Sequence, residues 1–201
     1  NKFDKSNSFE LANLFIKYGM GIATGDDKKF ISIDKKELEI KFEDHSLIKK
    51  ISYRLFDTRF INYDNSKIER GRKELMTHLL PQNNLGLISL KRARNNFTSK
   101  FGIVNQISDK SVISTLDNSF VFPLYLYPET KSQQTIEQIS VRTPNFNVQI
   151  IKIIAGKLGL TFTKERETTT NTFAPIDILD YIYAVLHSPT YREKYKEFLK
   201  I

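Results

Sequence analysis

Three stretches of the sequence combine residue types that could carry chemistry. The first, GMGIATGDDKK at residues 19–29, sets three glycines within seven residues in front of two acids and two lysines. The second, Glu39-Ile40-Lys41, has the E-x-K form of metal-dependent nucleases, in which carboxylates hold Mg²⁺ and the lysine supports the attacking water. The third, KRARNNF at residues 91–97, offers three cations and two amides. The corresponding functions are phosphate binding, hydrolysis and recognition of nucleic acid.

The glycine-rich stretch does not have the spacing of a nucleotide-binding loop. Its G-x-G-x-x-x-G pattern is one residue longer than the dinucleotide fingerprint, and it lacks the G-K-[S/T] ending of a triphosphate-binding loop. The alternation of residues 30–33 predicts that a strand follows, so that no helix N-terminus would hold a pyrophosphate. We predict a turn that requires glycine backbone angles, after which Lys28 and Lys29 could still contact a phosphate.

The E-x-K stretch lies in a segment of helical periodicity. Leu38 and Phe42 are four residues apart and share one face of a helix predicted over residues 35–43. The nuclease motif requires a strand with a second acid just upstream, so a solvated helix face is favoured for Glu39 and Lys41. No serine stands in a G-x-S-x-G elbow and the chain has no cysteine nucleophile. We therefore predict no active site in this chain.

The basic stretch after residue 90 has the composition of a DNA-reading loop. Arginine can pair with guanine and asparagine with adenine through two hydrogen bonds, and the same cations can contact phosphates. Its candidate side chains could thus both grip DNA and read bases. A solvated hairpin tip explains the same composition equally well from local sequence. The candidates are Lys91, Arg92, Arg94, Asn95 and Asn96.

Four further arginines form a second basic set. Arg54 and Arg59 flank Asp57, which favours a structural ion pair at least as strongly as a DNA contact. Arg70 and Arg72 stand one residue apart and are additional candidates for phosphate contact.

Charge and composition limit the class of protein. Thirty-one Lys and Arg against 23 Asp and Glu give the 201-residue chain a formal charge of +8, which favours a polyanionic partner. The absence of cysteine excludes disulfides and thiolate metal sites, and three histidines leave little for a metal site. We expect a cytoplasmic chain with no membrane partner, because no run approaches the ~18 apolar residues of a membrane-spanning helix. The chain begins without Met and ends within a helical pattern, so we expect part of a longer protein.

The periodicities predict an α+β fold, with a central, mostly antiparallel region of short strands, helices at both ends and a C-terminal helical pair. Strands are predicted at residues 30–33, at two places within 51–63, and at 85–90, 101–107, 111–114 and 121–127. Helices are predicted at residues 8–17, 35–43, 72–80, 145–158, 175–187 and 189–200.

Single residues mark several of the predicted boundaries. Asn145 is predicted to cap a helix that ends at Gly159, and Pro175 and Pro189 suit first helical positions. Pro123 argues that its strand lies at an edge or a bulge. The aromatic spacing in the last helices favours helix–helix packing over a stacking platform for single-stranded DNA.

Five motifs in order resemble one protein family. GIATGD at 21–26 is similar to its G-I-x-T-G-x-D, YRLFDTR at 53–59 to Y-R-P-F-D-x-R, residues 70–78 to R-x-R-x-x-x-M-x-H, and FPLYLYP at 122–128 to F-P-L-Y-L-Y-P. With the tail YIYAVLHSPTYR at 181–192, the chain resembles the C-terminal portion of type ISP single-polypeptide restriction–modification enzymes. Two departures stand out: leucine at position 55 replaces the usual proline, and residues 90–101 match no fixed pattern, as a segment that varies with the recognised sequence would.

The resemblance implies a target-recognition domain from a bacterial enzyme, without catalytic activity of its own. The cofactor-binding and N-P-P-Y motifs of the methyltransferase and the motifs of the helicase are absent from the chain. Residues 1–30 would form the seam with a methyltransferase domain, 31–143 a β-rich recognition core, and 144–201 the helical part of the same domain. The portion would use no cofactor, whereas the parent N6-adenine methyltransferase, fused to an endonuclease and helicase, would use S-adenosylmethionine, ATP and Mg²⁺.

The implied partners are double-stranded DNA and the methyltransferase domain of the same parent chain. Two other interpretations stay open, a metal-dependent nuclease fragment that uses Glu39 and Lys41, and a structural docking module whose basic charge is incidental. The residues expected to contact DNA are, in order, Lys91, Arg92, Arg94, Asn95 and Asn96, then Lys28 and Lys29, then Arg70 and Arg72.

Overall fold

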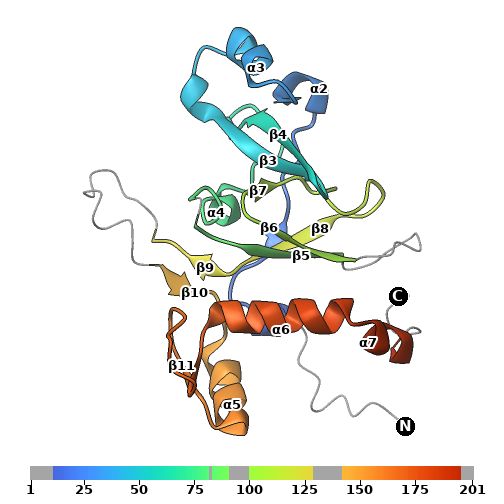
Figure 1. Ribbon diagram of the computed structural model, residues 1–201. Helices are drawn as coiled ribbons and strands as arrows, with labels where there is room; N and C mark the ends of the chain where they lie inside the picture. The colour runs from blue at the N-terminus through green and yellow to red at the C-terminus, as the bar shows by residue number, and fades with distance from the viewer. Residues whose placement is uncertain (1–10, 82, 91–99, 129–141, 196–201) are drawn as a thin grey trace.

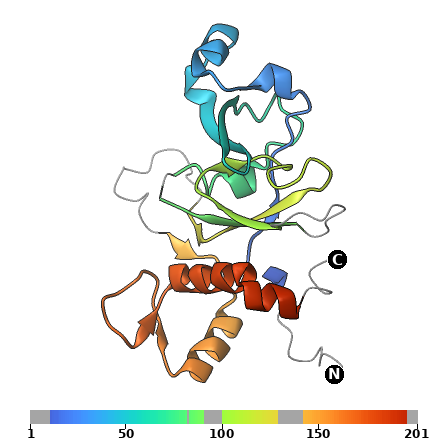
Figure 2. The same ribbon diagram turned by 45° about the vertical axis from the view of Figure 1, so that its right-hand side comes forward.

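Two sheets lie one above the other, with a layer of helices beneath the second (Figure 1). The computed structural model describes residues 11–81, 83–90, 100–128 and 142–195. The predicted α+β class is confirmed, because helices accompany strands that pair mainly in antiparallel register. The same order of layers is visible after a turn of 45° (Figure 2).

Each of the two main sheets has four strands. The first sheet has the order β2-β4-β3-β7 and the second the order β1-β8-β5-β6. The strands of the first are β2 (Ile31–Ser32), β3 (Ile48–Arg54), β4 (Asp57–Asn62) and β7 (Ile107–Ser108). Those of the second are β1 (Gly19–Met20), β5 (Gly86–Leu90), β6 (Phe101–Val104) and β8 (Ser119–Pro123). Two small pairs are formed by β9 (Tyr125–Leu126) with β10 (Thr143–Pro144) and by β11 (Thr161–Phe162) with β12 (Thr172–Phe173).

The described helices are mostly short, and the two longest lie in the C-terminal part. Those of the first half are α1 (Leu11–Leu14), α2 (Asp27–Phe30), α3 (Lys35–Lys41), the 3-10 turn η2 (His45–Leu47) and α4 (Lys73–Met76). Those of the second half are α5 (Val148–Leu158), α6 (Pro175–His187) and α7 (Pro189–Lys194). Pro175 and Pro189 occupy first helical positions, as predicted. Among the described helices, none is long and apolar enough to cross a membrane.

The second sheet is the middle layer, and its strand β5 is buried along its whole length. Successive strand residues point to opposite faces, so Ile88 joins the core above the sheet and Leu87 the core below it. On β8, Val121 likewise joins the upper core and Phe122 the lower core. A strand covered on both faces is expected to be apolar throughout, which explains the sequence GLISL.

The two cores join the layers. The upper core packs Ile51 and Ile61 of the first sheet against Ile88 and Val121, and α4 adds Met76. The lower core combines the underside of the second sheet with α5 and α6, which run beneath it (Figure 1). The second sheet therefore has a fixed position between two packed layers.

Several sequence predictions in the β region were wrong in their boundaries. Residues 101–107 form two strands in different sheets, because the polar pair Asn105-Gln106 separates β6 from β7. Residues 111–114 form no strand; this segment turns, and Ser114 Oγ accepts from the backbone N–H of Asp117 at 3.2 Å. Val112 is buried there by tertiary packing.

Helix boundaries needed correction as well. Asn147, not Asn145, caps α5, because the Asn147 side chain accepts from the Gln149 N–H at 3.0 Å. Asn145 is fully buried, and its Nδ2 donates to the carbonyls of Lys17 and Pro123, both at 2.7 Å. A one-turn helix, α2, lies between Gly25 and the strand that was predicted to follow directly. The predicted helix 72–80 is regular only over α4, after which the chain turns.

Candidate nucleic-acid interface

The main predicted DNA contacts fall outside the described residues. Lys91, Arg92, Arg94, Asn95 and Asn96 lie in the connection between β5 and β6. The two strands are paired in antiparallel register, and the Leu90 N–H donates to the Lys100 carbonyl at 3.1 Å. The predicted loop thus follows the buried strand β5 and precedes the partly exposed strand β6, and its contacts stay a prediction.

Lys28 and Lys29 lie exposed on α2, immediately after the glycine-rich stretch. Gly25 has φ +82°, which is the turn geometry predicted for a glycine here. The carboxylate of Asp26 caps α2 by accepting from the Lys29 N–H at 3.1 Å. Because the Asp26 carboxylate already caps this helix end, a phosphate would be bound by the lysine side chains rather than by backbone N–H groups.

The second predicted basic set lies beside the glycine-rich stretch. Ala23 and Arg70 exchange backbone hydrogen bonds of 3.1 and 2.9 Å, which brings two family motifs together. The Arg70 side chain is exposed and its Nε lies 3.3 Å from a Glu69 carboxylate oxygen. Arg72 is half-buried with φ +53° at the start of α4, and its Nε has no hydrogen-bond partner among the described residues.

The YRLFDTR motif forms a cation–aromatic cluster at the β3–β4 hairpin. The guanidinium carbons of Arg54 and Arg59 lie 3.9 and 4.0 Å from the centre of the Tyr53 ring. The Tyr53 hydroxyl donates to Asp27 at 3.0 Å, which ties this hairpin to α2. Burial, together with this hydrogen bond, raises the pKa of Tyr53.

Ion pairs complete the cluster, partly as predicted. Arg59 pairs with Asp57 at 2.8 Å, whereas Arg54 pairs with the buried Asp109 at 3.0 Å instead of with Asp57. Burial raises the pKa of Asp109. Gly21 is required beside it, since a Cβ at that position would lie 2.5 Å from the Asp109 carbonyl oxygen.

The remaining family motifs also meet in space. His78 lies at the end of the third motif and Tyr127 in the fourth. The Tyr127 N–H donates to His78 Nδ1 at 3.1 Å. Buried Asn84 joins the same two segments, since its Nδ2 donates to the carbonyls of His78 at 2.7 Å and Tyr125 at 2.8 Å. These hydrogen bonds link the third and fourth motif segments, whereas the candidate base-reading residues 91–96 lie outside the described residues.

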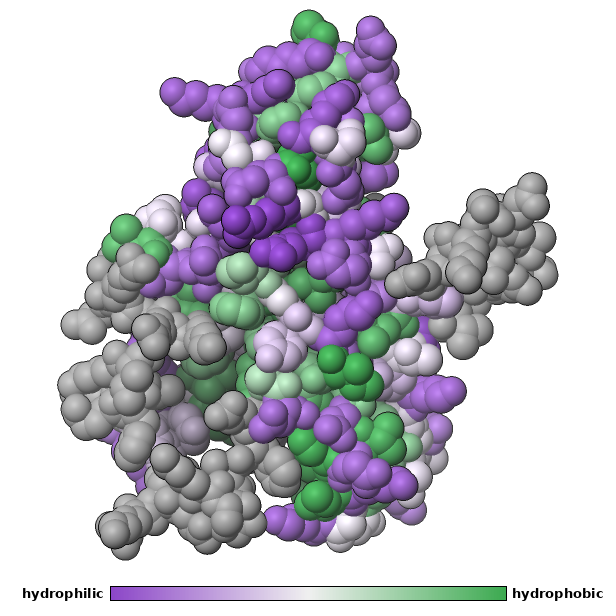
Figure 3. Space-filling view, turned by 180° about the vertical axis from the view of Figure 1, so that it is seen from behind, coloured by the Kyte–Doolittle hydropathy of each residue, from purple (hydrophilic) through white to green (hydrophobic). Residues whose placement is uncertain are grey.

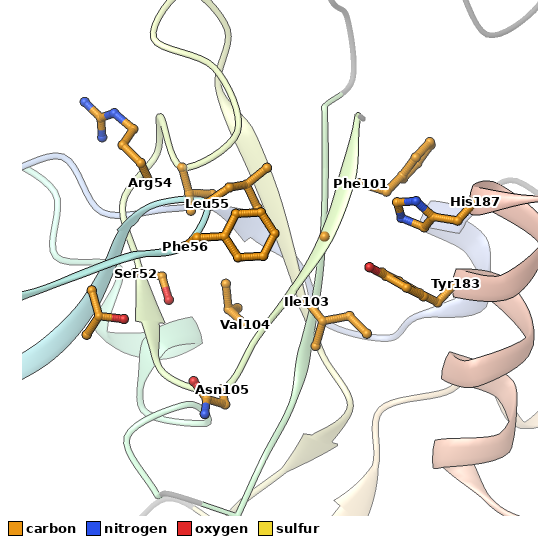
Figure 4. A pocket seen from close by; sticks show the side chains of 13 residues that line it. Ser52, Arg54, Leu55, Phe56, Phe101, Ile103, Val104, Asn105, Tyr183 and His187 are labelled. Carbon is orange, nitrogen blue, oxygen red and sulfur yellow. The ribbon is translucent and has the colours of Figure 1, made fainter. Parts of the chain in front are cut away.

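Two adjoining pockets follow the solvent-facing side of the β3–β4 hairpin and share Asn105. We call them together the hairpin groove. The pocket nearer the tip has a volume of about 340 Å³ and is closed on its far side by Tyr183 and His187 of α6 (Figure 4). The second, of about 550 Å³, is lined by Lys35, Lys49 and Lys50 among others. Among the described residues, neither lining contains an acidic side chain.

The groove has polar and cationic residues that the sequence reasoning missed. Gln106 Nε2 donates to Ser52 Oγ at 3.2 Å and to Thr58 Oγ1 at 3.1 Å across β3 and β4. Lys49 and Lys50 are exposed. The KK pair inside IKKISYR was the available signal, because two adjacent lysines in a strand cannot both be buried. Seen from behind, the part of the molecule that carries α2, α3 and β3 is mainly hydrophilic (Figure 3).

Glu39 and Lys41 do not form a catalytic pair. Both lie on α3, as the helical periodicity predicted, and each pairs with another residue of that helix. Lys35 contacts Glu39 at 2.6 Å and Lys41 contacts Glu37 at 2.5 Å. Within the part of the chain that the structure describes, no group of three acid or histidine side chains could hold a metal ion.

Solved structures share the fold, among them three complexes with DNA or a DNA mimic. A cryo-EM complex of DrdV with DNA matches with a TM-score of 0.69 and 18% identity, over 93% of this chain and 21% of that chain. The ATP-dependent type ISP restriction–modification enzyme LlaBIII bound to DNA matches with a TM-score of 0.66 and 17% identity, over 98% of this chain and 14% of that chain. A nuclease-deletion mutant of the type ISP restriction–modification enzyme LlaGI in complex with a DNA substrate mimic matches with a TM-score of 0.60 and 16% identity, over 92% of this chain and 19% of that chain. This chain therefore spans between 14% and 21% of those proteins.

Sequence comparison assigns the chain to a family, whereas the structures show only the fold that it shares. A search of curated proteins gave no match. The sequence model of the type ISP C-terminal specificity domain matches residues 23–201, which include strands β2 to β12 and the last three described helices. The resemblance seen in the five motifs is thereby confirmed, and the chain belongs to the family of type ISP C-terminal specificity domains.

Proposed function

We propose that this chain binds duplex DNA and selects the site at which a type ISP restriction–modification enzyme acts. Membership of the specificity-domain family supports this function. Three solved structures that share its fold are complexes with DNA or a DNA mimic, which supports the same partner. The formal charge of +8 favours a polyanion.

The observation that carries the proposal is the hairpin groove beside the β5–β6 connection. Lys49 and Lys50 provide exposed cations, and no acid opposes them among the described lining residues. Phe101, the first residue of β6, lines the pocket of the groove nearer the hairpin tip, so the connection ends at that part of the groove. A duplex whose phosphates lay along the groove would bring its bases within reach of the connection.

Phosphate contact and base reading would be divided between these two parts. Lysines bind phosphates as point charges and give little sequence preference, whereas paired hydrogen bonds from Arg and Asn distinguish bases. We therefore assign phosphate contact to the groove lysines, with Lys28, Lys29, Arg70 and Arg72 as further candidates. Base reading falls to the connection, whose candidates are Lys91, Arg92, Arg94, Asn95 and Asn96.

The chemistry of the parent enzyme would lie in other domains. We propose N6-adenine methylation with S-adenosylmethionine, a motor that uses ATP, and Mg²⁺-dependent cleavage, with the methyltransferase domain of the same chain as the neighbour of residues 1–30. This portion would need no cofactor. The division into residues 1–30, 31–143 and 144–201 and a cytoplasmic location stay predictions.

Duplex binding at increasing salt tests the proposal. The chain is titrated into labelled random-sequence duplex and fluorescence anisotropy is recorded. Neutralised phosphates release counterions, so the logarithm of affinity should fall linearly with the logarithm of salt, with a slope of about −0.9 for each phosphate contacted. A flat salt response, or no binding to any duplex at low salt, would favour the docking-module alternative instead.

A further inference from the structure

Phe56 has a conformation and an exposure that the fold does not explain. Its relative exposure is 105%, so the ring buries no surface within the described structure. It stands at φ +65° in the two-residue connection between Arg54 and Asp57, at a turn position that favours glycine. A left-handed conformation is costly for a side chain of this size. Nothing in the described packing offsets that cost.

The backbone beneath Phe56 is held from both sides. The Leu55 N–H donates to the Val112 carbonyl at 2.8 Å. The neighbouring arginines are fixed by the ion pairs with Asp57 and Asp109 described above, so the two acids near the tip are each engaged with a cation. The ring is consequently presented to solvent by a tip that has little freedom to fold back.

Other aromatic rings face the same hollow. Tyr183 and His187 lie on α6 with ring centres 4.2 Å apart, and Figure 4 shows them on one side of β6 with Phe56 on the other. Gly102 lies on β6 in the same lining and adds no side chain to it. Asn105 and Thr58 supply an amide and a hydroxyl at its edge. The hollow thus combines flat apolar walls with a few hydrogen-bonding groups, in a volume of about 340 Å³.

We infer that this hollow receives one nucleobase of the bound DNA, stacked on the ring of Phe56. The inference rests on the proposed DNA binding and adds a contact outside the β5–β6 connection. Every base has a flat π-face that can stack on an aromatic ring, and its edge can bond to an amide or a hydroxyl. Because no acid lines the hollow among the described residues, a DNA strand can approach without repulsion there.

Substitution of Phe56 tests the inference by affinity for the duplex that the wild-type chain selects from a random pool. Phe56→Ala should weaken binding about five- to 150-fold, as loss of one base–aromatic stack does, whereas Phe56→Trp should stay within a few-fold of wild type. Tyr181→Ala is the control, because Tyr181 is a 71% exposed aromatic residue on α6, the helix of Tyr183 and His187, but does not line the hollow. Thermal unfolding of Phe56→Ala should match wild type, since the ring buries nothing.

Fluorescence of 2-aminopurine gives a second readout. Placed in turn along the selected duplex, this base analogue should change its emission at one position on binding to the wild-type chain, and Phe56→Ala should abolish that change. Equal affinity and equal emission for wild type and Phe56→Ala would overturn the inference while leaving duplex binding intact. If the wild-type chain binds no duplex, both the inference and the proposed function fail.

Discussion

Hairpin β3–β4 exposes one side to solvent and closes with two residues, whereas hairpin β5–β6 contains a fully buried strand and closes over residues 91–100. Family motif residues build the first: Tyr53, Arg54 and Arg59 fix its tip through ring and ion-pair contacts. The connection of the second carries none of the five motifs. Under the proposed function, the contacts of the first hairpin would hold the scaffold while the connection of the second selects the DNA site.

The largest expected effect is on the buried strand of the second hairpin. Ile88→Ala should lower the free energy of unfolding by about 2–5 kcal/mol, because it opens a cavity at a fully buried position between two packed layers. Chemical denaturation measures the loss. Ile103→Ala on the neighbouring β6 is the control, since Ile103 is 37% exposed. Equal losses in the two variants would show that the second sheet is not the packed middle layer.

The connection of the same hairpin should behave in the opposite way. Arg92→Ala and Arg94→Ala should each weaken binding to the selected duplex by about 1–3 kcal/mol if each makes a paired contact to a base. The free energy of unfolding should be unchanged if these two side chains act only on DNA. Anisotropy against selected and random duplexes measures both affinities, with Lys157→Ala on α5 as a control. Unchanged affinity and salt slope in both arginine variants would remove the connection from the recognition surface.

Lysines of the first hairpin should change binding without changing sequence preference. Lys49→Gln and Lys50→Gln should each reduce the salt slope by about one and weaken selected and random duplexes alike, because a phosphate contact carries no sequence information. Salt titration of both duplexes measures this, with Lys157→Gln as the control. A change in preference between the duplexes would instead assign these lysines to base reading.

The smallest effect is expected at the tip of the first hairpin. Phe56→Gly removes about 1–2 kcal/mol of left-handed strain but adds about 0.5–1 kcal/mol of freedom to the unfolded chain. The free energy of unfolding should therefore stay constant or rise slightly in denaturant titrations. A decrease of about 1 kcal/mol or more would mean that the ring is packed against part of the protein.

Elements with local signals were predictable from the sequence. Asp34 caps α3 by accepting from the Lys36 N–H at 2.9 Å, and Pro175 and Pro189 begin their helices. Two strands within residues 51–63 were predicted from two apolar runs, and β3 and β4 confirm them. The break between them was predicted at Asp57-Thr58, but these residues begin β4 and the chain turns at Leu55-Phe56. Each of these signals lies within a few residues of the structure that it determines.

Features that depend on distant contacts were not predictable. Asn145 resembles a helix cap in sequence, but its side chain bonds to Lys17, 128 positions away, and to Pro123. The division of residues 101–107 between two sheets depends on which strands each half meets. The hairpin groove brings together β3, β6 and α6, so its shape and the environment of Phe56 could not be recognised from spacing, although the Lys49-Lys50 pair signalled exposed cations.

Site selection by two chains tests the central claim most directly. The wild-type chain and a variant whose residues 91–96 are replaced by Gly and Ser are each used to enrich duplexes from the same random pool. We predict that the wild-type chain enriches one defined site, while the variant keeps salt-dependent binding and enriches none. Enrichment of the same site by both chains would contradict the assignment of base reading to the β5–β6 connection.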